Sequence, residues 1–140
     1  MALVVPNEGE LELLDKMLKD ALSVDENYVL KLFKNNVTPS QVFSAGSLTE
    51  ADFTNYAAKT LTRTTWNVAV TNGSNKAETS YSTSPQSWTA GTTGNTIYGY
   101  YVVGATSTAV LWVERFATAR VLSNGDVLNL TPKFTLNSEN

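Results

Sequence analysis

The stretch GYYVVGATSTAVLWVERF, residues 99–116, is the most apolar part of this 140-residue chain. Successive side chains of a β-strand point to opposite faces, so a strand with one face in water alternates apolar and polar residues. Here both faces are apolar, and the small residues in the middle predict a hairpin. Burying one large apolar side chain contributes about 1.5–3 kcal/mol, so a second face left in water would forfeit stability and favour aggregation. We therefore expect both faces to be covered.

Strict alternation also predicts which side chains of the hairpin share a face. In the first strand it groups Ile97, Tyr101 and Val103 against Tyr98, Tyr100 and Val102. In the return strand it groups Leu111 and Val113 against Val110, Trp112 and Phe116. A second sheet can cover one of these faces. The other requires a helix of the same chain or a neighbouring subunit.

Further strands are predicted along the chain at NYVLKLFKN, TRTTWNVAV, KAETSYS, QSWTA and residues 128–136. Asn72-Gly73 and Asn124-Gly125 predict tight turns, because such turns need positive φ. Pro132 cannot donate to a strand ladder, so the last strand should lie at an edge or carry a bulge. Residues 35–58 predict a loop with a helical turn at LTEADF. The fold class we expect is mainly β: a jelly-roll-like β-sandwich of about eight strands.

The N-terminal region predicts an apolar arm, residues 1–7, and one amphipathic helix over 8–22. Asn7 is the expected N-cap, with Glu10 completing a capping box. The remaining residues, 8–140, form a single predicted domain that includes this helix. The arm has no basic region and a short apolar stretch, so we expect no signal peptide. No apolar run approaches the ~18 residues that would span a bilayer.

Composition argues against several function classes. The chain has no Cys and no His, which removes thiol chemistry, the commonest general base and the commonest transition-metal ligand. Its net charge of −3 gives no basic footprint for nucleic acid. We expect no enzyme, no catalytic residue, no cofactor, no metal site and no binding to nucleic acid or membranes. A carboxylate pair for sugar hydrolysis would draw on Glu78, Glu114 or Asp126, but their spacing brings no two together.

The aromatic side chains allow two interpretations. They could stack on sugar rings, as in carbohydrate-binding modules, which would require Trp88 or Tyr98 on an accessible surface. More often, aromatic residues in strands belong to a core or an interface. The aromatic residues concerned are Trp66, Trp88, Trp112, Tyr98, Tyr100 and Tyr101.

The apolar surface predicts an oligomer, with a cyclic trimer ahead of a dimer. The arm and the loop at 35–50 are the expected contacts beyond the subunit. Glu114 and Arg115 are adjacent and point to opposite faces, so each should meet an opposite charge elsewhere. The predicted oligomer interface consists of Tyr98, Tyr100, Trp112, Glu114, Arg115 and Phe116. The predicted contacts of the arm and the loop with a further partner are Leu3, Val4, Val5, Val42 and Phe43.

Several segments together resemble small virion structural proteins of tailed bacteriophages, the capsid cement or decoration proteins among them. These segments are MALVVPNEGELELLDKML, TEADFTNYAAKTL, TGNTIYGYYVV, LWVERF and SNGDVLNLTPKFTL. The resemblance implies a β-rich homotrimer that bridges neighbouring major capsid proteins in a virion assembled in the bacterial cytoplasm. The predicted capsid contact is then Leu3, Val4, Val5, Val42 and Phe43. It implies no catalytic residue. The alternative is a tail-associated or glycan- or receptor-binding β-sandwich module.

Overall fold

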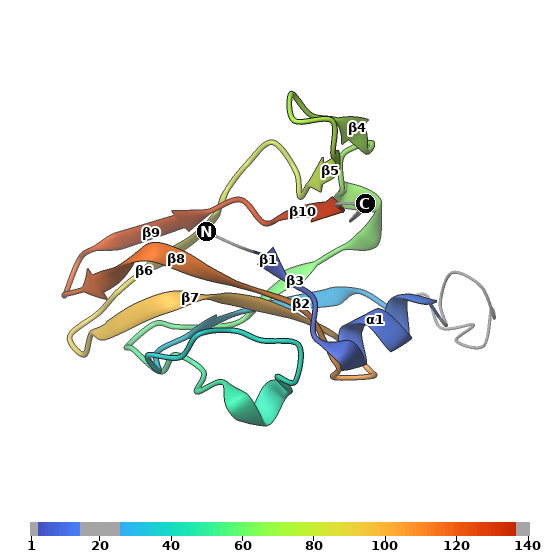
Figure 1. The fold of residues 1–140 in the computed structure, drawn as a ribbon. Coiled ribbons are helices and arrows are strands. Elements are labelled where there is room, and N and C mark those ends of the chain that lie inside the picture. Colours follow the sequence, from blue (N-terminus) through green and yellow to red (C-terminus); the bar gives the residue numbers. More distant parts are fainter. Residues whose placement is uncertain (1–2, 15–25, 137–140) are drawn as a thin grey trace.

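The computed structural model describes residues 3–14 and 26–136, and this part of the chain is mainly β, with antiparallel sheets and one helix (Figure 1). Residues 15–22 of the predicted helix lie outside the described residues. The elements are β1 (Leu3–Val4), α1 (Asn7–Leu14), β2 (Tyr28–Phe33), η2 (Ala45–Ser47), β3 (Lys59–Leu61), η3 (Arg63–Thr65), β4 (Val70–Thr71), β5 (Ala77–Ser80), β6 (Gln86–Thr89), β7 (Asn95–Gly104), β8 (Val110–Leu122), β9 (Val127–Leu130) and β10 (Lys133–Leu136).

A five-stranded antiparallel sheet in the order β1-β8-β7-β2-β3 forms the centre of the molecule. The predicted apolar hairpin is β7 and β8, and β7 lies in the middle of this sheet. The predicted strand NYVLKLFKN is confirmed as β2, which pairs with β7 from Tyr28↔Gly104 to Phe33↔Gly99. The side chains of β2 alternate between two faces, because Leu30 and Leu32 belong to one apolar cluster and Phe33 to another.

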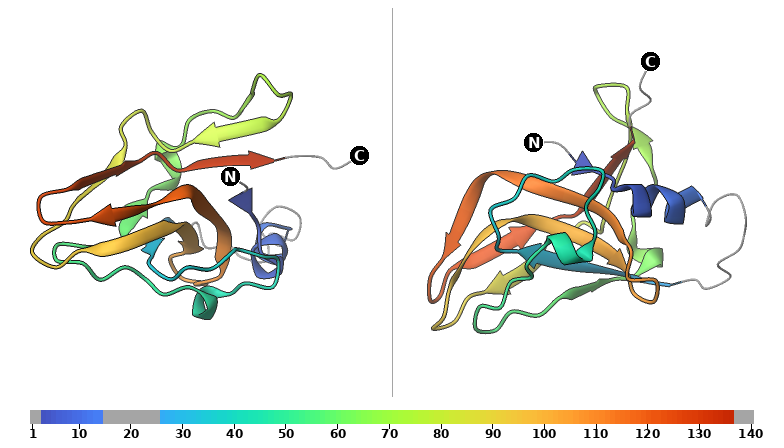
Figure 2. Two further views of the ribbon diagram at one scale, coloured as in Figure 1. Left: turned by 60° about the vertical axis from the view of Figure 1, so that its left-hand side comes forward. Right: turned by 60° about the horizontal axis from the view of Figure 1, so that its bottom comes forward.

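The first apolar cluster, the main core, lies between the five-stranded sheet and the smaller sheets β6-β9 and β10-β5-β4 (Figure 2). Leu30 and Val102 of the large sheet meet Trp88 of β6 and Leu128 of β9 in this cluster. Phe134 of β10 packs its ring 5.0 Å from that of Trp112. One face of the hairpin is thus covered by other strands, as expected.

The second face of the sheet is covered by residues 34–50 of the same chain, which cross it in Figures 1 and 2. Phe33, Tyr101 and Val113 on the sheet pack with Leu48 and Phe43 of this covering segment. We expected a helix or a neighbouring subunit in this place. The residues instead come from the segment predicted to be a loop, and LTEADF within it contains no helical turn. Its Leu and Phe side chains pack against the sheet although they belong to no helix or strand.

Two shifts in the pairing of β7 with β8 change which hairpin side chains share a face. The pairing of β7 with β8 shifts between Ile97 and Gly99 and again between Val102 and Val103. As a result Ile97 joins the main core and Tyr98 packs against the second cluster, the reverse of the predicted grouping. Likewise Leu111 joins the main core. Across the first shift β8 runs about three residues further than β7, and across the second about one, so strict alternation fails at each.

The N-terminal arm is part of the sheet. We expected it to find no place in a compact monomer, yet Leu3 pairs with Glu114 and Val4 with Val113, which makes β1 an edge strand. The helix α1 includes Asn7, so the predicted N-cap lies within it. A Cβ at Gly9 would approach Val110 O to 2.5 Å, which explains why a glycine occupies the face of α1 that packs on β8.

Two of the predicted strands differ from the strands in the structure. TRTTWNVAV contains the 3-10 helix η3 and only the first residue of β4, Val70, because Val68 and Val70 are exposed and have no core to join. The predicted strand at 128–136 is interrupted at Thr131-Pro132, so that β9 pairs with β6 and β10 with β5. Pro132 is fully buried, and its carbonyl accepts from Tyr81 N at 2.9 Å. The proline thus moves the chain from one sheet to the next.

Candidate functional site

Two of the predicted interface residues are buried inside the chain. Tyr100 is 2 % exposed and Trp112 is 4 % exposed, so neither offers a side-chain surface to a partner. Tyr100 Oη donates to Glu114 Oε2 at 2.5 Å. Glu114 therefore meets a phenol of its own chain, where we expected an opposite charge.

Arg115 fixes the covering segment onto the sheet. Its guanidinium donates to Val37 O and to Asn36 Oδ1 and lies 5.3 Å from the centre of the Tyr98 ring. Planar guanidinium groups suit this combination of hydrogen bonds and ring stacking. Arg115 and Tyr98 thus serve the fold within one chain.

Phe116, the remaining predicted interface residue, lines a groove of about 570 Å³ between β8 and β9. Val121 and Val127, 70 % and 54 % exposed, also line this groove. β1 pairs with β8 only at residues 113 and 114, and the side of β9 away from β6 pairs with no strand in the described part of the chain. From Thr118 to Leu122 the same holds for the side of β8 away from β7. The groove therefore lies between two strand edges.

The predicted capsid-contact residues divide into packed and exposed ones. Leu3 and Val5 pack against the main core, and Phe43 packs against the second cluster. Val42 is 80 % exposed beside them. The neighbouring Gln41 carbonyl accepts from Asn7 N at 2.8 Å, so the segment carrying Val42 is tied to the start of α1.

The residues named for sugar binding or sugar hydrolysis do not form such a site. Trp88 is 2 % exposed, and its Nε1 donates to Ala57 O at 2.8 Å, which makes it a core residue. Tyr98 is half-buried under Arg115. Glu78, Glu114 and Asp126 each bond different partners: Lys133 and Asn72, Tyr100, and Ser123 N, respectively.

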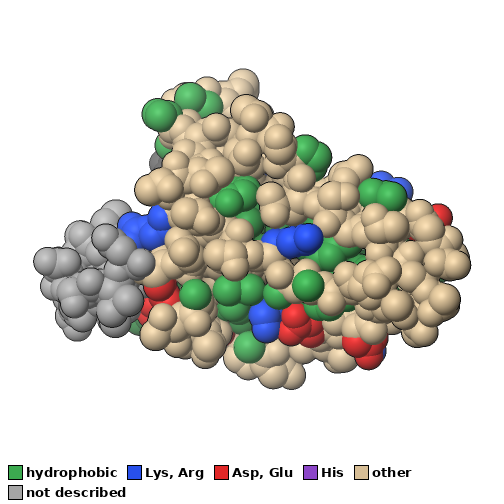
Figure 3. Space-filling view, turned by 180° about the vertical axis from the view of Figure 1, so that it is seen from behind, with side chains coloured by type: hydrophobic (Ala, Val, Ile, Leu, Met, Phe, Trp, Pro, Cys, Tyr) green, Lys and Arg blue, Asp and Glu red, His purple; other side chains and the backbone are tan. Residues whose placement is uncertain are grey.

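On the face seen in Figure 3, hydrophobic side chains lie in a band across the middle, beside Lys or Arg and Asp or Glu side chains.

A cavity of about 270 Å³ is lined by aromatic side chains that include Trp66, Trp112 and Phe134. Trp66 and Trp112 pack edge to face, with ring centres 5.9 Å apart. This packing is typical of an aromatic core.

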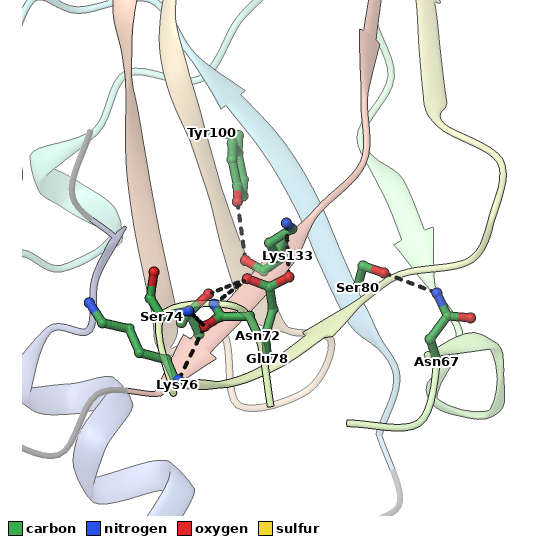
Figure 4. A network of polar contacts seen from close by, with 9 residues as sticks. Asn67, Asn72, Ser74, Lys76, Glu78, Ser80, Tyr100 and Lys133 are labelled. Atoms are coloured by element: carbon green, nitrogen blue, oxygen red, sulfur yellow. Dashed lines mark hydrogen bonds and ion pairs between the residues drawn. The ribbon is translucent and has the colours of Figure 1, made fainter. Parts of the chain in front are cut away.

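A polar cluster around Glu78 combines reactive groups from three strands or their turns (Figure 4). Glu78 Oε1 lies 2.9 Å from Lys133 Nζ, and Glu78 Oε2 accepts from Asn72 Nδ2 at 3.0 Å. The Thr135 hydroxyl also donates to Oε2, at 3.4 Å. One carboxylate thus holds an amine on one oxygen and a carboxamide on the other.

The carboxamide of Asn72 is held on its oxygen as well. Asn72 Oδ1 accepts from Ser74 N at 2.9 Å and from Lys76 N at 3.1 Å, within the turn between β4 and β5. The hydrogen bond from Asn72 to the Glu78 carboxylate, followed by that from Lys133, holds the pKa of Glu78 below its ordinary value. Glu78 is therefore a carboxylate at neutral pH.

The sequence alone gives no reason to group these three residues. The sequence indicates Asn72 as a turn residue, Glu78 as a candidate for a carboxylate pair, and Lys133 only as part of the strand predicted at 128–136. Only the pairing of β5 with both β4 and β10 brings them together. The available signal in the sequence was the alternation of side chains within each strand, with opposite charges at Glu78 and Lys133. This signal indicates a contact only once the strand register is known.

Among the described residues, no group of His, Cys, Asp and Glu could hold a metal ion, and no helix is long and apolar enough to cross a membrane. No family model matches the sequence, and no curated protein matches it.

Proposed function

We propose that this chain is a structural protein of a bacteriophage virion, a decoration protein that binds the capsid and bridges neighbouring major capsid proteins. Its fold would be a jelly-roll-like two-layer sandwich, and its working form a homotrimer. The resemblance in the apolar hairpin and in the segments on either side supports this class. The observation that carries the proposal is the groove between the edges of β8 and β9.

A strand edge presents backbone N–H and C=O groups, and proteins protect long exposed edges because they pair with other chains. Here two edges face one groove, with the exposed Val121 and Val127 in its lining. An extended segment of a neighbouring chain could pair with β8 there and cover both valines. This would bury apolar area that the isolated chain leaves in water.

A groove is concave, so its complement on a second copy is a different surface. Such heterologous contacts close into rings, which favours a cyclic trimer over a two-fold dimer. Val42, held outward on the covering segment, would then contact the capsid. Three copies of a weak contact bind by avidity.

The oligomeric state tests the groove. Sedimentation equilibrium should give a trimer for the wild-type chain and a monomer for the double variant Val121→Lys/Val127→Lys, because two buried charges would oppose the contact. Val68→Lys is the matched control, since Val68 is 87 % exposed and lies outside the groove lining. A wild-type monomer, or a trimer of the groove variant, would contradict the proposed contact.

The virion location has a separate test. Mass spectrometry of purified particles of the phage that encodes this chain should find it in stoichiometric amount with the major capsid protein. Immunogold labelling should mark the capsid shell. Labelling confined to the tail would support the tail-associated alternative, and particles without the chain would contradict both.

A further inference from the structure

The cluster of Asn72, Glu78 and Lys133 contains the groups needed to join two side chains covalently. We propose that Asn72 and Lys133 form an isopeptide bond within the chain, with Glu78 moving the protons between them. This inference stands apart from the proposed function and uses only groups of this chain.

The strand register explains why these three side chains meet. Glu78 of β5 lies opposite Val70 of β4 and opposite Thr135 of β10. Asn72 is two residues beyond Val70, and Lys133 is two residues before Thr135. Residues two apart share a face, so Asn72 and Lys133 are the diagonal neighbours of Glu78 on its two sides. Figure 4 shows both side chains directed toward the Glu78 carboxylate.

The reaction balances without any co-reactant. The Lys133 ammonium gives one proton to the Glu78 carboxylate, and the neutral amine attacks Cγ of Asn72 to form a C–N bond. The tetrahedral intermediate then loses its original C–N bond. The leaving nitrogen takes this proton from Glu78, and the second amine proton reaches it through the same carboxylate. One ammonium ion therefore leaves, Glu78 is again a carboxylate, and a Lys–Asn amide remains.

Each group is placed for its step. The two backbone N–H groups on Asn72 Oδ1, from Ser74 and Lys76, lie where negative charge develops on that oxygen during attack. Glu78 Oε2 already accepts from Asn72 Nδ2, the nitrogen that must leave. Glu78 Oε1 contacts the attacking Lys133 Nζ. Glu78 is therefore the catalytic residue of this reaction.

Carboxylates are ionised between about pH 7 and about pH 9, so Glu78 can accept a proton from the Lys133 ammonium across this range. Glu78, from β5, is the charged group that contacts Lys133 Nζ. Tyr100 of β7 donates to the Lys133 backbone carbonyl at 3.5 Å and to Glu114 of β8, and Lys76 points away from the cluster (Figure 4). Glu78 stays ionised over this range and remains the proton acceptor.

Mass spectrometry of the intact protein, aged at about pH 9, tests the bond. The wild-type chain should lose the mass of one ammonia. Trypsin cuts after Lys and Arg, so it should then release a branched peptide joining residues 64–76 to 121–140 through Asn72 and Lys133. Lys133→Arg and Glu78→Gln should keep the full mass, since a guanidinium is no nucleophile and Gln accepts no proton. Lys34→Arg, which alters another ion-paired lysine, should cross-link like the wild type.

Asn72-Gly73 offers a competing loss of ammonia, because the Gly73 backbone nitrogen can attack the same carbon. That succinimide would persist in Lys133→Arg and would give no branched peptide, and this outcome overturns the proposal. An unchanged wild-type mass also overturns it. Should Lys133→Arg fail to fold, by circular dichroism, the branched peptide of the wild type decides by its presence or absence.

Discussion

Tyr100 shows how one buried polar group links both strands of the central hairpin. Its hydroxyl donates to Glu114 Oε2, while its ring packs within the main core. Burial, and then the hydrogen bond to the Glu114 carboxylate, raise the pKa of Tyr100 far above its ordinary value. Burial likewise raises the pKa of Tyr56 and of Tyr101. All three phenols are therefore protonated in the folded chain at neutral pH.

This predicts a loss of stability at alkaline pH. In the unfolded chain these phenols ionise at about pH 10, whereas in the folded chain they hold their protons to higher pH. Their contribution to the free energy of unfolding is therefore complete below about pH 10 and falls as the pH rises above it. Urea unfolding at about pH 8 and about pH 11 measures the fall.

Tyr100→Phe is the control for this prediction. It removes one raised pKa, so stability should decrease less between the two pH values, even though the variant starts from a lower stability. An equal decrease in both proteins would show that other groups cause it.

The elements of this fold follow from the sequence where alternation is uninterrupted and depart from it where backbone geometry intervenes. β2 could be predicted with both of its faces, because Leu30, Leu32 and Phe33 are separated by no bulge. The hairpin β7–β8 could be located but not its faces, since the shift in pairing beside Gly99 moves the side chains on one side of it to the other face. The buried Pro132 carries no signal that distinguishes a strand edge from a change of sheet.

The candidate site was less predictable than the elements. The three members of the Glu78 cluster come from separate strands, so their contact depends on pairing that local patterns do not specify. The covering segment was equally hidden. Val37, Phe43 and Leu48 have no helical or strand period, and their burial follows only from the apolar second face of the sheet.

Arg115 should determine how firmly the covering segment is held. Arg115→Ala removes hydrogen bonds from a charged donor, worth about 1.5–3 kcal/mol each, so local opening of residues 34–50 should become about tenfold more frequent or greater. Limited chymotrypsin digestion, with cleavage after Phe43, measures this opening. Arg120→Ala, an exposed arginine of the same strand, should digest at the wild-type rate. Equal rates for both variants would show that Arg115 does not hold the segment.

At the scale of the whole molecule, the five-stranded sheet separates two apolar clusters and contributes side chains to both. The main core lies on one side and the smaller cluster around Phe33 on the other. Both contain fully buried residues of β2. The covering segment is thus a layer of the structure, although it contains almost no regular secondary structure.

Truncations on the two sides of β2 test whether both clusters belong to one cooperative unit. Phe33→Ala should cost about 3–5 kcal/mol and Leu30→Ala about 2–5 kcal/mol, since each leaves a cavity in a closed cluster. Val68→Ala, at a side chain 87 % exposed, should change stability by less than about 0.5 kcal/mol. Denaturant unfolding should show a single transition in each variant. A separate early transition in Phe33→Ala would mean that the covering layer unfolds alone.

The pairing of Leu3 with Glu114 has a consequence for synthesis on the ribosome. β1 leaves the exit tunnel well before β8, the strand with which it pairs, and has no partner until β8 has followed it. The hydrogen bond that Glu8 accepts from Val110 N, at 2.7 Å, likewise forms only after β8 has emerged. β2, β3 and β7 can pair with one another earlier, because their partners emerge sooner. The N-terminus therefore docks late in folding, onto a sheet already assembled from the middle of the chain.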